Sequence, residues 1–434
     1  MKIKTKKLPY EEVMKLPRAK EKDPCTPSPV LRKLIYALAS SELKKAGFIC
    51  NEGDMKGVGE TEPALYLMNH SCFTDLMIAS HVIKGPYNIV STTDALVGKE
   101  TLMRKIGCIP TRKFQTDIRL IRNIKYALET LHCSVLMYPE AGYSFDGTTT
   151  ALPESLGKFV KLLGFPVVMI CTHGAFLHDP LYNGLRIRKC RITADKYTLF
   201  TADEARSLSE EEIGERIHKA FSFDGFAEQF ETGTRITEDF RAEGLSRVLY
   251  KCPVCGKEGK MHASGTDIEC MECSSVWELT ELGKMKYKNA DIPAKMSAPK
   301  LFDHIPDWYA WERDCVRKEL ESGSYHLEVP VNIRMIVDNK AMYDVGEGVL
   351  THSREGFHLT GCEGQLDYYR KPLSSYTVNS DYFFYEIGDM ISIGDRDKIF
   401  YCFPPKDKDV VAKTRLAAEE LYKIKKGVFI PTAF

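Results

Sequence analysis

The chain has 434 residues and a mass of 49.2 kDa, which is enough for about three domains with cores of their own. Hydrophobic residues make up 44% and charged residues 28%, which is typical of a folded globular protein and excludes a disordered one. Sixty Lys and Arg balance sixty Asp and Glu, so no net charge favours nucleic acid. Fourteen cysteines in this length are too dilute for a disulfide scaffold, and we expect a reducing compartment.

The N-terminus carries lysines but lacks the apolar stretch and the small-residue cleavage site of a secretory signal. The longest apolar runs, such as residues 165–171, are far shorter than the roughly 20 residues of a membrane-spanning helix. The sequence therefore predicts neither a secretory signal nor a membrane span.

A basic amphipathic helix is predicted near the N-terminus, because the first fifty residues hold 12 Lys or Arg against 5 Asp or Glu. Ser28 followed by Pro29 is typical of a helix start, and Gly47 is typical of a helix end. An apolar stripe lies between them: Leu31, Leu34, Ile35, Leu38 and Leu43. The stripe either packs on the domain core or lies on a membrane surface that carries anionic lipid.

Short apolar strands alternate with helices between residues 64 and 197. Apolar runs predict strands at 64–68, 87–92, 134–139 and 166–172. Helical periodicity predicts helices at 73–83, 117–131 and 154–163. The alternation predicts an α/β domain with a largely buried sheet.

The pattern changes beyond this region. A charged helical stretch is predicted over residues 209–247 and a linker over 288–300. From 325 to 405, short β-like runs alternate with Gly, Asp and Asn. A final amphipathic helix is predicted from its apolar residues: Val410, Val411, Ala417, Leu421 and Ile424.

His70 and Asp75 form the first candidate catalytic pair, within the run Asn69-His70-Ser71-Cys72-Phe73-Thr74-Asp75. On one continuous helix, residues five positions apart point in different directions and do not touch. If His70 lies in the turn before the helix, the Asp75 carboxylate reaches the imidazole and fixes its tautomer. A histidine held in this way is a general base for a hydroxyl; the alternative is a structural cap at the helix start.

Three further segments follow in order: Gly107-Cys108-Ile109-Pro110-Thr111-Arg112-Lys113, Tyr138-Pro139-Glu140-Ala141-Gly142-Tyr143-Ser144 and Gly164-Phe165-Pro166-Val167-Val168. Together with residues 69–75, they resemble the four blocks of the glycerolipid acyltransferase family, which makes phosphatidic acid from lysophosphatidic acid (1-acylglycerol-3-phosphate). The resemblance covers roughly residues 30–220. It implies a mixed α/β sheet flanked by helices.

The resemblance also implies a role for each matching residue. His70 is the general base and Asp75 its orienting partner, so that the acceptor hydroxyl attacks an acyl thioester directly. Arg112, assisted by Lys113, binds the acceptor's phosphate, which suits a planar cation with several donors. The other substrate-binding residues are Asn69, Gly107, Glu140 and Gly142. From residue types alone, Arg112 and Lys113 also fit a solvated charge pair, and Glu140 also fits a buried carboxylate that holds loops.

The third block departs from the family pattern, which is Phe-Pro-Glu-Gly-Thr-Arg-Ser. After Glu140 this chain has Ala141, Gly142 and Tyr143, so the second arginine is missing, which weakens phosphate binding by about 1–3 kcal/mol. The acceptor is therefore lysophosphatidate, a lysolipid with another head group, or a different hydroxyl or amine. Cys72 is interpreted as an apolar filler, because the family mechanism needs no covalent intermediate.

Two CxxC pairs predict a metal site, Cys252 with Cys255 and Cys270 with Cys273, and fourteen residues separate them. This spacing is close to that of a zinc ribbon, in which two thiolates from each of two turns bind one Zn²⁺ tetrahedrally. Four cysteine ligands leave no position for water, so the zinc is expected to be structural. His262 is an alternative ligand. The ribbon binds protein or nucleic acid, and the neutral charge disfavours nucleic acid.

The C-terminal β segments and their closing helix are similar, in the order of elements, to a pleckstrin-homology-type barrel. This similarity implies lipid binding; a β domain for protein contacts is the alternative. Tyr368, Tyr369, Arg370 and Lys371 form either a lipid-facing edge or a plain surface.

Four segments are expected: an acyltransferase domain with the basic helix (1–248), a zinc ribbon (249–286), a linker and helix (287–324) and a β-rich pleckstrin-homology-like domain with a C-terminal helix (325–434). The expected function is transfer of a fatty acyl group from acyl-CoA or acyl carrier protein to a hydroxyl of a lysolipid such as lysophosphatidate. The expected location is cytoplasmic, peripheral on the inner face of a phospholipid membrane. The alternative is a non-catalytic lipid-binding or adaptor protein on an acyltransferase-like scaffold.

Overall fold

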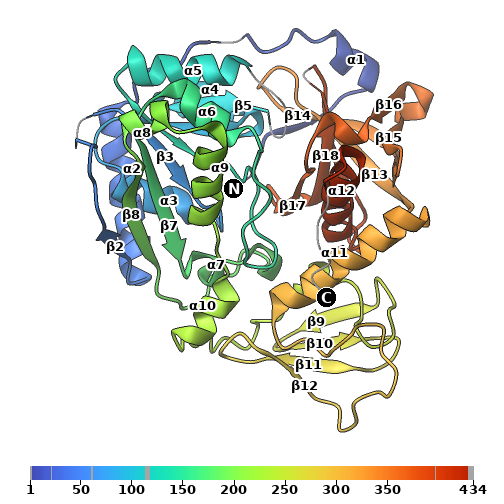
Figure 1. Ribbon diagram of the computed structural model, residues 1–434. Helices are drawn as coiled ribbons and strands as arrows, with labels where there is room; N and C mark the ends of the chain where they lie inside the picture. The colour runs from blue at the N-terminus through green and yellow to red at the C-terminus, as the bar shows by residue number, and fades with distance from the viewer. Residues whose placement is uncertain (1, 21, 60–61, 113–117, 396, 429–434) are drawn as a thin grey trace.

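The strands predicted between residues 64 and 172 form a seven-stranded mixed sheet in the computed structural model, which describes residues 2–20, 22–59, 62–112, 118–395 and 397–428. The strand order is β2-β8-β7-β3-β6-β4-β5. Strands β8, β7 and β3 lie side by side on the left of Figure 1. The strands are β2 (Ile49–Glu52), β3 (Leu65–Met68), β4 (Tyr87–Thr92), β5 (Cys108–Thr111), β6 (Ser134–Met137), β7 (Val167–His173) and β8 (Thr193–Phe200). The four predicted strands are confirmed, and β2, β5 and β8 complete the sheet.

Helices cover both faces of this sheet. Along β3, Leu65 and Leu67 face one core with α5, α6 and α9, whereas Tyr66 and Met68 face the other with α2 and α3. The helices are α2 (Pro29–Lys45), α3 (Asp75–Val82), α4 (Glu100–Ile106), α5 (Ile118–Glu129), α6 (Leu156–Leu163), α7 (Ala175–His178), α8 (Ala202–Ser207), α9 (Glu210–Ala220) and α10 (Gly225–Glu231). This arrangement confirms the predicted α/β class.

The carboxyl ends of five strands lie along one edge of the sheet, because β3, β4, β5, β6 and β7 run parallel. β3 ends just before His70, β6 just before Tyr138 and β5 just before Arg112. Ligands of open α/β sheets bind beyond the carboxyl ends of the strands. The predicted blocks therefore meet at the edge where a ligand site is expected.

The N-terminal helix α2 begins as predicted, since the backbone N–H of Leu31 donates to the Ser28 hydroxyl oxygen (3.5 Å). Its apolar stripe, however, divides into two rows. Leu43 is buried against the domain, whereas Leu34 and Leu38 are 54% and 66% exposed. Leu43 therefore packs on the core while Leu34 and Leu38 face solvent, so the two predicted alternatives both stay open.

The charged stretch predicted as helical over residues 209–247 is only partly so. It forms α9 and α10, after which Thr232 and Gly233 end the helix and turns follow up to the 3₁₀ turn Leu245–Arg247. Gly233 has φ 65°, a left-handed conformation that glycine adopts without steric cost and that ends a helix.

A four-stranded antiparallel sheet follows, in the order β12-β11-β10-β9 (Figure 1). Its strands are β9 (Met261–Ser264), β10 (Asp267–Cys270), β11 (Val276–Leu279) and β12 (Met285–Tyr287). Residues 288–304, which include the predicted linker, contain no helix or strand. Helix α11 (Ile305–Ser322) then packs Trp308 against Trp277 of the small sheet, with ring centroids 5.0 Å apart.

The C-terminal β runs form one sheet in the order β16-β15-β14-β13-β19-β18-β17, and helix α12 (Val411–Lys426) closes it. The strands are β13 (Leu327–Met335), β14 (Met342–Ser353), β15 (Gly356–Gly361), β16 (Leu366–Arg370), β17 (Asn379–Phe384), β18 (Gly388–Gly394) and β19 (Ile399–Phe403). The expected edge at residues 368–371 is not one surface: Tyr369 is 49% exposed, but Arg370 is only 8% exposed because it points into the seam with the first sheet.

The N-terminus reaches this C-terminal sheet. β1 (Thr5–Lys7) pairs with β14 in parallel, and α1 (Tyr10–Lys15) follows it. The remaining 3₁₀ turns are Thr93–Leu96, Leu181–Asn183, Cys362–Gly364 and Pro372–Ser374. Among the described residues, no helix has both the length and the apolar character to cross a membrane.

Candidate acyltransferase site

His70 and Asp75 have the geometry predicted for a histidine–carboxylate pair. His70 lies in the turn after β3 and Asp75 is the first residue of α3. The Nδ1 atom of His70 is 3.2 Å from the Oδ2 atom of Asp75. Because Asp75 occupies Nδ1, the imidazole is held in the tautomer whose Nε2 atom accepts a proton. His70 remains partly exposed, with 15% of its side chain accessible, whereas Asp75 is fully buried.

Asp75 is fixed by the backbone of the same turn. Its Oδ2 atom accepts hydrogen bonds from the backbone N–H groups of Ser71 (2.7 Å) and Cys72 (3.1 Å). Burial raises the pKa of the Cys72 thiol well above its usual value, and the Asp75 carboxylate adds to the shift. The thiol therefore stays protonated, which agrees with Cys72 as a filler and not a nucleophile.

Glu140 ties the His70 turn to the loop of the third block. One carboxylate oxygen accepts from the backbone N–H of His70 (2.7 Å) and the other from the backbone N–H of Thr150 (2.8 Å). Burial raises the pKa of Glu140 to about 7, while the two backbone hydrogen bonds partly oppose the shift. These contacts correspond to the loop-holding alternative for Glu140.

Asn69 joins β3 to its neighbour β7. Its Oδ1 atom accepts from the backbone N–H (2.8 Å) and the hydroxyl (3.1 Å) of Thr172, and its Nδ2 atom donates to the Thr172 carbonyl oxygen (3.2 Å). Asn69 thus fixes the strand end from which His70 projects. Direct contact of Asn69 with substrate remains a prediction.

Two tyrosines of the third block lie against the His70 imidazole. The ring centroids of Tyr138 and Tyr143 are each 4.2 Å from that of His70. Tyr143 stands where the resembled family pattern has arginine, so in this chain an aromatic ring lies beside the base. The sequence predicts the loss of the cation, but its local pattern does not indicate that the new ring reaches the histidine.

The tyrosine loop is held from the far end of the chain. The Nη1 group of Arg415, on α12, donates to the Tyr143 carbonyl oxygen (2.9 Å), and its other nitrogens donate to the carbonyl (2.7 Å) and hydroxyl (3.0 Å) oxygens of Ser380. The guanidinium also lies 3.5 Å above the Phe145 ring. Arg415 was missed by sequence reasoning, because no local motif links α12 to the third block.

The remaining block residues separate along the sheet. Arg112 follows the carboxyl end of β5 and lines a cavity that the first sheet shares with the C-terminal sheet. Gly107 precedes β5 at the opposite end, where a Cβ atom would lie 2.7 Å from Pro27 Cγ, so close packing requires glycine there. Lys113 lies outside the described residues. The acceptor contacts of Gly107 and Lys113 remain predictions.

Gly142 lies beside the arginine that holds the loop. A Cβ atom there would meet Arg415 Nη2 at 3.6 Å, an ordinary van der Waals distance. The neighbouring Ala141 has φ 53°, a left-handed conformation that is costly for a residue with a Cβ atom. The resembled family pattern has glycine at this position, the residue that adopts such a conformation without steric cost.

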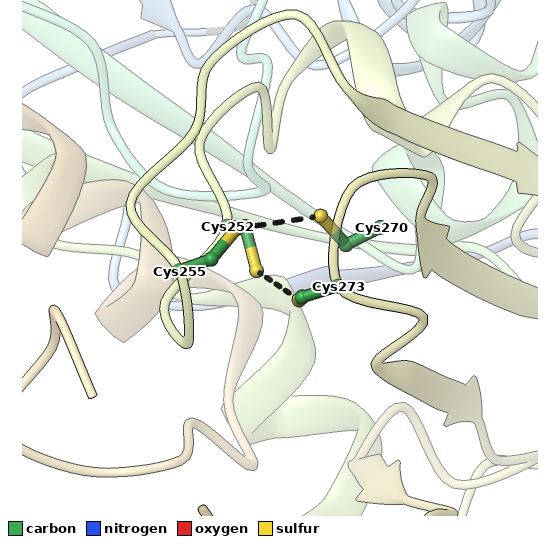
Figure 2. A group of neighbouring side chains, drawn as sticks. All are labelled: Cys252, Cys255, Cys270 and Cys273. Atoms are coloured by element: carbon green, nitrogen blue, oxygen red, sulfur yellow. Dashed lines mark hydrogen bonds between the residues drawn. The ribbon is translucent and has the colours of Figure 1, made fainter. Parts of the chain in front are cut away.

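The four cysteines of the CxxC pairs gather at one point, and their side chains point toward one another from two turns (Figure 2). All four sulfurs lie within 4.8 Å of one another, and the pairs Cys252–Cys273 and Cys255–Cys270 are each separated by 3.7 Å. A tetrahedron with Zn–S bonds of about 2.3 Å has edges of about 3.8 Å. The group therefore fits one tetrahedral metal ion.

The comparisons with known proteins concern the segment that holds His70 and Asp75. Among solved structures, the chain is similar to the crystal structure of the 1-acyl-sn-glycerophosphate (LPA) acyltransferase PlsC from Thermotoga maritima, with a TM-score of 0.36 and 12% identity over 44% of this chain and 76% of that chain. No curated protein matches. Residues 52–195, which include His70, Asp75 and Glu140, match the family model Acyltransferase. Residues 52–195 of this chain are therefore similar to the acyltransferase family.

Proposed function

We propose that this protein moves a fatty acyl group from acyl-CoA or acyl carrier protein to a hydroxyl of a glycerophospholipid precursor. The observation that carries this proposal is the 3.2 Å contact between His70 Nδ1 and Asp75 Oδ2 inside a segment that matches the acyltransferase family. Its position beyond the carboxyl end of β3 supports a role in binding and chemistry rather than in capping alone.

In the proposed reaction, the Nε2 atom of His70 takes the proton of the acceptor hydroxyl. The oxygen attacks the carbonyl carbon of the acyl thioester, and a tetrahedral intermediate forms. The carbon–sulfur bond then breaks, and the leaving thiolate takes the proton back from the imidazolium. Asp75 stabilises the imidazolium during these steps, and no covalent acyl-enzyme is formed.

The acceptor we propose is lysophosphatidate, with Arg112 binding its phosphate. Arg112 lies at the same edge of the sheet as His70, three strands away in the order β3-β6-β4-β5. At about 4.8 Å per strand, the strand ends are about 14 Å apart, a gap that the long arginine side chain shortens. Because Tyr143 stands in place of the family's second arginine, the acceptor is to be identified by direct measurement.

The proposed location is the surface of a phospholipid membrane, on its cytoplasmic face. Val30, Leu34 and Leu38 form the exposed row of α2 and are 75%, 54% and 66% exposed. Arg32 and Lys33 lie on the same helix. An exposed apolar row with neighbouring cations favours insertion into the interface of an anionic membrane.

The order of strands and the closing helix α12 also support a pleckstrin-homology-like C-terminal domain.

For the cysteine group we propose a structural Zn²⁺ in a ribbon formed by β9–β12, held by Cys252, Cys255, Cys270 and Cys273. Four thiolates would complete a tetrahedral shell and leave no coordination position for substrate. The zinc would therefore stabilise the fold and take no part in acyl transfer.

The function is tested by mixing the purified protein with palmitoyl-CoA or palmitoyl-acyl carrier protein and one acceptor at a time. The acceptors are lysophosphatidate, other lysophospholipids and glycerol 3-phosphate, and mass spectrometry detects the ester. We expect an ester with lysophosphatidate that is absent for His70→Ala. If folded wild-type protein yields no ester with any pair of donor and acceptor but binds lysolipid vesicles, the chain is instead a non-catalytic lipid-binding protein. The rings of Tyr138 and Tyr143, which lie against the His70 imidazole, would then explain the lack of catalysis.

A further inference from the structure

A polar cavity lies in the seam between the first sheet and the C-terminal sheet. Asp94 and Arg112 line it from the carboxyl ends of β4 and β5, and Arg370, Asn379 and Tyr401 line it from β16, β17 and β19. Two guanidinium groups from segments more than 250 positions apart thus border the same space. The cavity measures about 20 Å³, which is room for about one water molecule.

Arg370 is buried, and its guanidinium forms no ion pair with a described side chain. It is 8% exposed, and no described residue accepts a hydrogen bond from its guanidinium or forms an ion pair with it. Desolvation lowers the pKa of Arg370, although the nearby Tyr368 and Asp395 oppose this shift. A buried cation is costly unless an anion and hydrogen bonds compensate it. The position of Arg370 therefore favours an anionic ligand in the cavity.

The cavity also has acceptor atoms that would receive hydrogen bonds. The Oδ1 atom of Asn379 is buried and has no hydrogen-bond partner among the described residues. Asp94 accepts from the phenol hydroxyls of Tyr385 (2.8 Å) and Tyr401 (3.5 Å), so its charge is partly satisfied. A phosphate monoester in its monohydrogen form would offer oxygens to the arginines and one P–OH donor to Asn379.

We propose that Arg370 and Arg112 together bind the phosphate of the acceptor, while the acceptor's single free hydroxyl is left for His70. Arg370 would thus supply, from the C-terminal sheet, the second cation that the third block lost where Tyr143 stands. This assignment rests on the proposed acyl transfer, and it makes the C-terminal sheet part of the acceptor site. Because the cavity is smaller than a phosphate group, binding moves the two arginine side chains apart.

The cavity is linked to the base through the tyrosines of the seam. Burial is the main cause that raises the pKa of Tyr385 far above its usual range, followed by Asp94, with a smaller contribution from the nearby Tyr143. Tyr143 itself lies against the His70 ring. Tyr385 donates to Asp94 in the cavity wall and Tyr143 lies against His70, so these two tyrosines connect the proposed phosphate site with the candidate base.

The test compares Arg370→Gln with Lys371→Gln, which removes the same charge from the next residue. Lys371 is exposed and does not line this cavity. Calorimetric titration with sn-glycerol 3-phosphate, and with inorganic phosphate as the simpler probe, gives the affinities. Loss of a charge-assisted bidentate contact predicts at least tenfold weaker binding for Arg370→Gln and no change for Lys371→Gln. Equal affinity of Arg370→Gln and wild type for both ligands would overturn the assignment.

Thermal melting separates a ligand role from a structural one. Removing an unpaired buried cation is neutral or stabilising, so Arg370→Gln should melt at or above the wild-type temperature without ligand. A lower melting temperature with unchanged phosphate affinity would make Arg370 a structural residue. If Arg370→Gln does not fold, Arg112→Gln and Arg370→Lys take its place. Arg112 is partly exposed, so its replacement should not prevent folding, and Arg370→Lys keeps the positive charge. If the two arginines bind one phosphate, the losses of binding free energy should not be additive in the double variant Arg112→Gln/Arg370→Lys. Additive losses would contradict a shared phosphate.

Activity distinguishes failure of this inference from failure of the proposed function. For lysophosphatidate, Arg370→Gln should raise KM at least tenfold with a smaller change in kcat, whereas transfer to an uncharged monoacylglycerol should not change. Unchanged KM in an active enzyme contradicts the Arg370 assignment and leaves acyl transfer standing. Weakened phosphate binding in a protein that transfers no acyl group contradicts the acyl transfer and supports the phosphate site alone.

Discussion

The Nη1 group of Arg415 donates a 2.9 Å hydrogen bond to the carbonyl oxygen of Tyr143, which lies 272 positions earlier in the chain. Tyr143 lies against the imidazole of His70, and Arg415 belongs to the C-terminal helix α12. The C-terminal helix therefore holds the loop that covers the candidate base. This contact joins the first sheet and the C-terminal sheet at the candidate site.

Replacing Arg415 with alanine should destabilise the protein and reduce acyl transfer. The variant leaves the carbonyl oxygens of Tyr143 and Ser380 without a donor and removes the cation from the Phe145 ring. Loss of hydrogen bonds from a buried charged group costs about 2–3 kcal/mol. Misplacement of the loop should lower the rate of thiol release about 10–100-fold. Urea unfolding and a thiol-release assay measure the two effects.

The matched control for this prediction is Lys425→Ala, which removes one positive charge from the exposed part of α12. Unfolding free energy within about 0.5 kcal/mol of wild type is expected for the control. An Arg415→Ala protein with wild-type stability and activity would show that the contact with Tyr143 does not hold the loop.

Glu140 should make stability depend on pH. Its pKa is about 7 in the folded chain and 4.5 is the ordinary value, so between these values the folded state keeps a proton that the unfolded state releases. The protonated Glu140 therefore stabilises the folded state at low pH, and this stabilisation is lost as the pH rises through 7. Relative to Glu140→Gln, the wild type should lose about 3 kcal/mol of unfolding free energy between pH 4.5 and 7.5.

Urea unfolding of both proteins across this pH range measures the difference. Glu129→Gln serves as the control, because the Glu129 side chain is 48% exposed and should show no such difference. A gap between wild type and Glu140→Gln that stays constant with pH would mean that Glu140 is already ionised in the folded chain at low pH.

Removal of metal should unfold the ribbon and leave the first sheet folded. The chain has three tryptophans, Trp277, Trp308 and Trp311, and all lie in the ribbon or in α11. Their fluorescence therefore reports on this region alone. We expect one zinc per chain by mass spectrometry, and a red shift of the emission when a strong chelator is added, because ribbon folding depends on the ion.

Cys252→Ser is the genetic counterpart of chelation, and Cys362→Ser, a buried cysteine outside the group, is its control. The control should keep its zinc. Full zinc content in Cys252→Ser, or an emission spectrum that does not respond to metal loss, would exclude a structural zinc at these four cysteines.

The exposed row of α2 should govern membrane binding. The double variant Leu34→Asp/Leu38→Asp places charge where two leucines are 54% and 66% exposed. Loss of apolar burial for both residues predicts at least tenfold weaker binding to vesicles with anionic lipid. Ile292→Asp, at another exposed position (68%), should bind as wild type. Equal binding by all three proteins in vesicle sedimentation would assign the membrane contact to another surface.

Local patterns predicted the elements whose signals lie within a few residues. The Ser28–Pro29 helix start, the four buried strands and the paired cysteines all depend on spacing along the chain, and the structure has each of them. The His70–Asp75 contact was predictable for the same reason, because only a turn before the helix brings residues five positions apart together.

Contacts between distant segments were not predictable in this way. The pairing of Thr5 with Met342 and the contacts of Arg370 and Arg415 have no signal in the neighbouring sequence. β14 was also hidden, because Gly346 and Gly348 are typical of a turn. In the structure Gly348 faces Gly361 across the sheet, where a Cβ atom would lie 2.2 Å from the Thr360 carbonyl oxygen. The glycines allow close strand packing there and do not end the strand.

The rate of acceptor-dependent thiol release from palmitoyl-CoA, compared among wild type, His70→Ala and His81→Ala, tests the central claim most directly. His81 lies on α3 and stacks on Tyr36, outside the site, so its variant controls for the loss of a histidine. We predict that lysophosphatidate stimulates release by the wild type and by His81→Ala, and that His70→Ala is slower by about 10²–10⁴-fold with an unchanged melting temperature. Release by His70→Ala at the wild-type rate would contradict His70 as the general base.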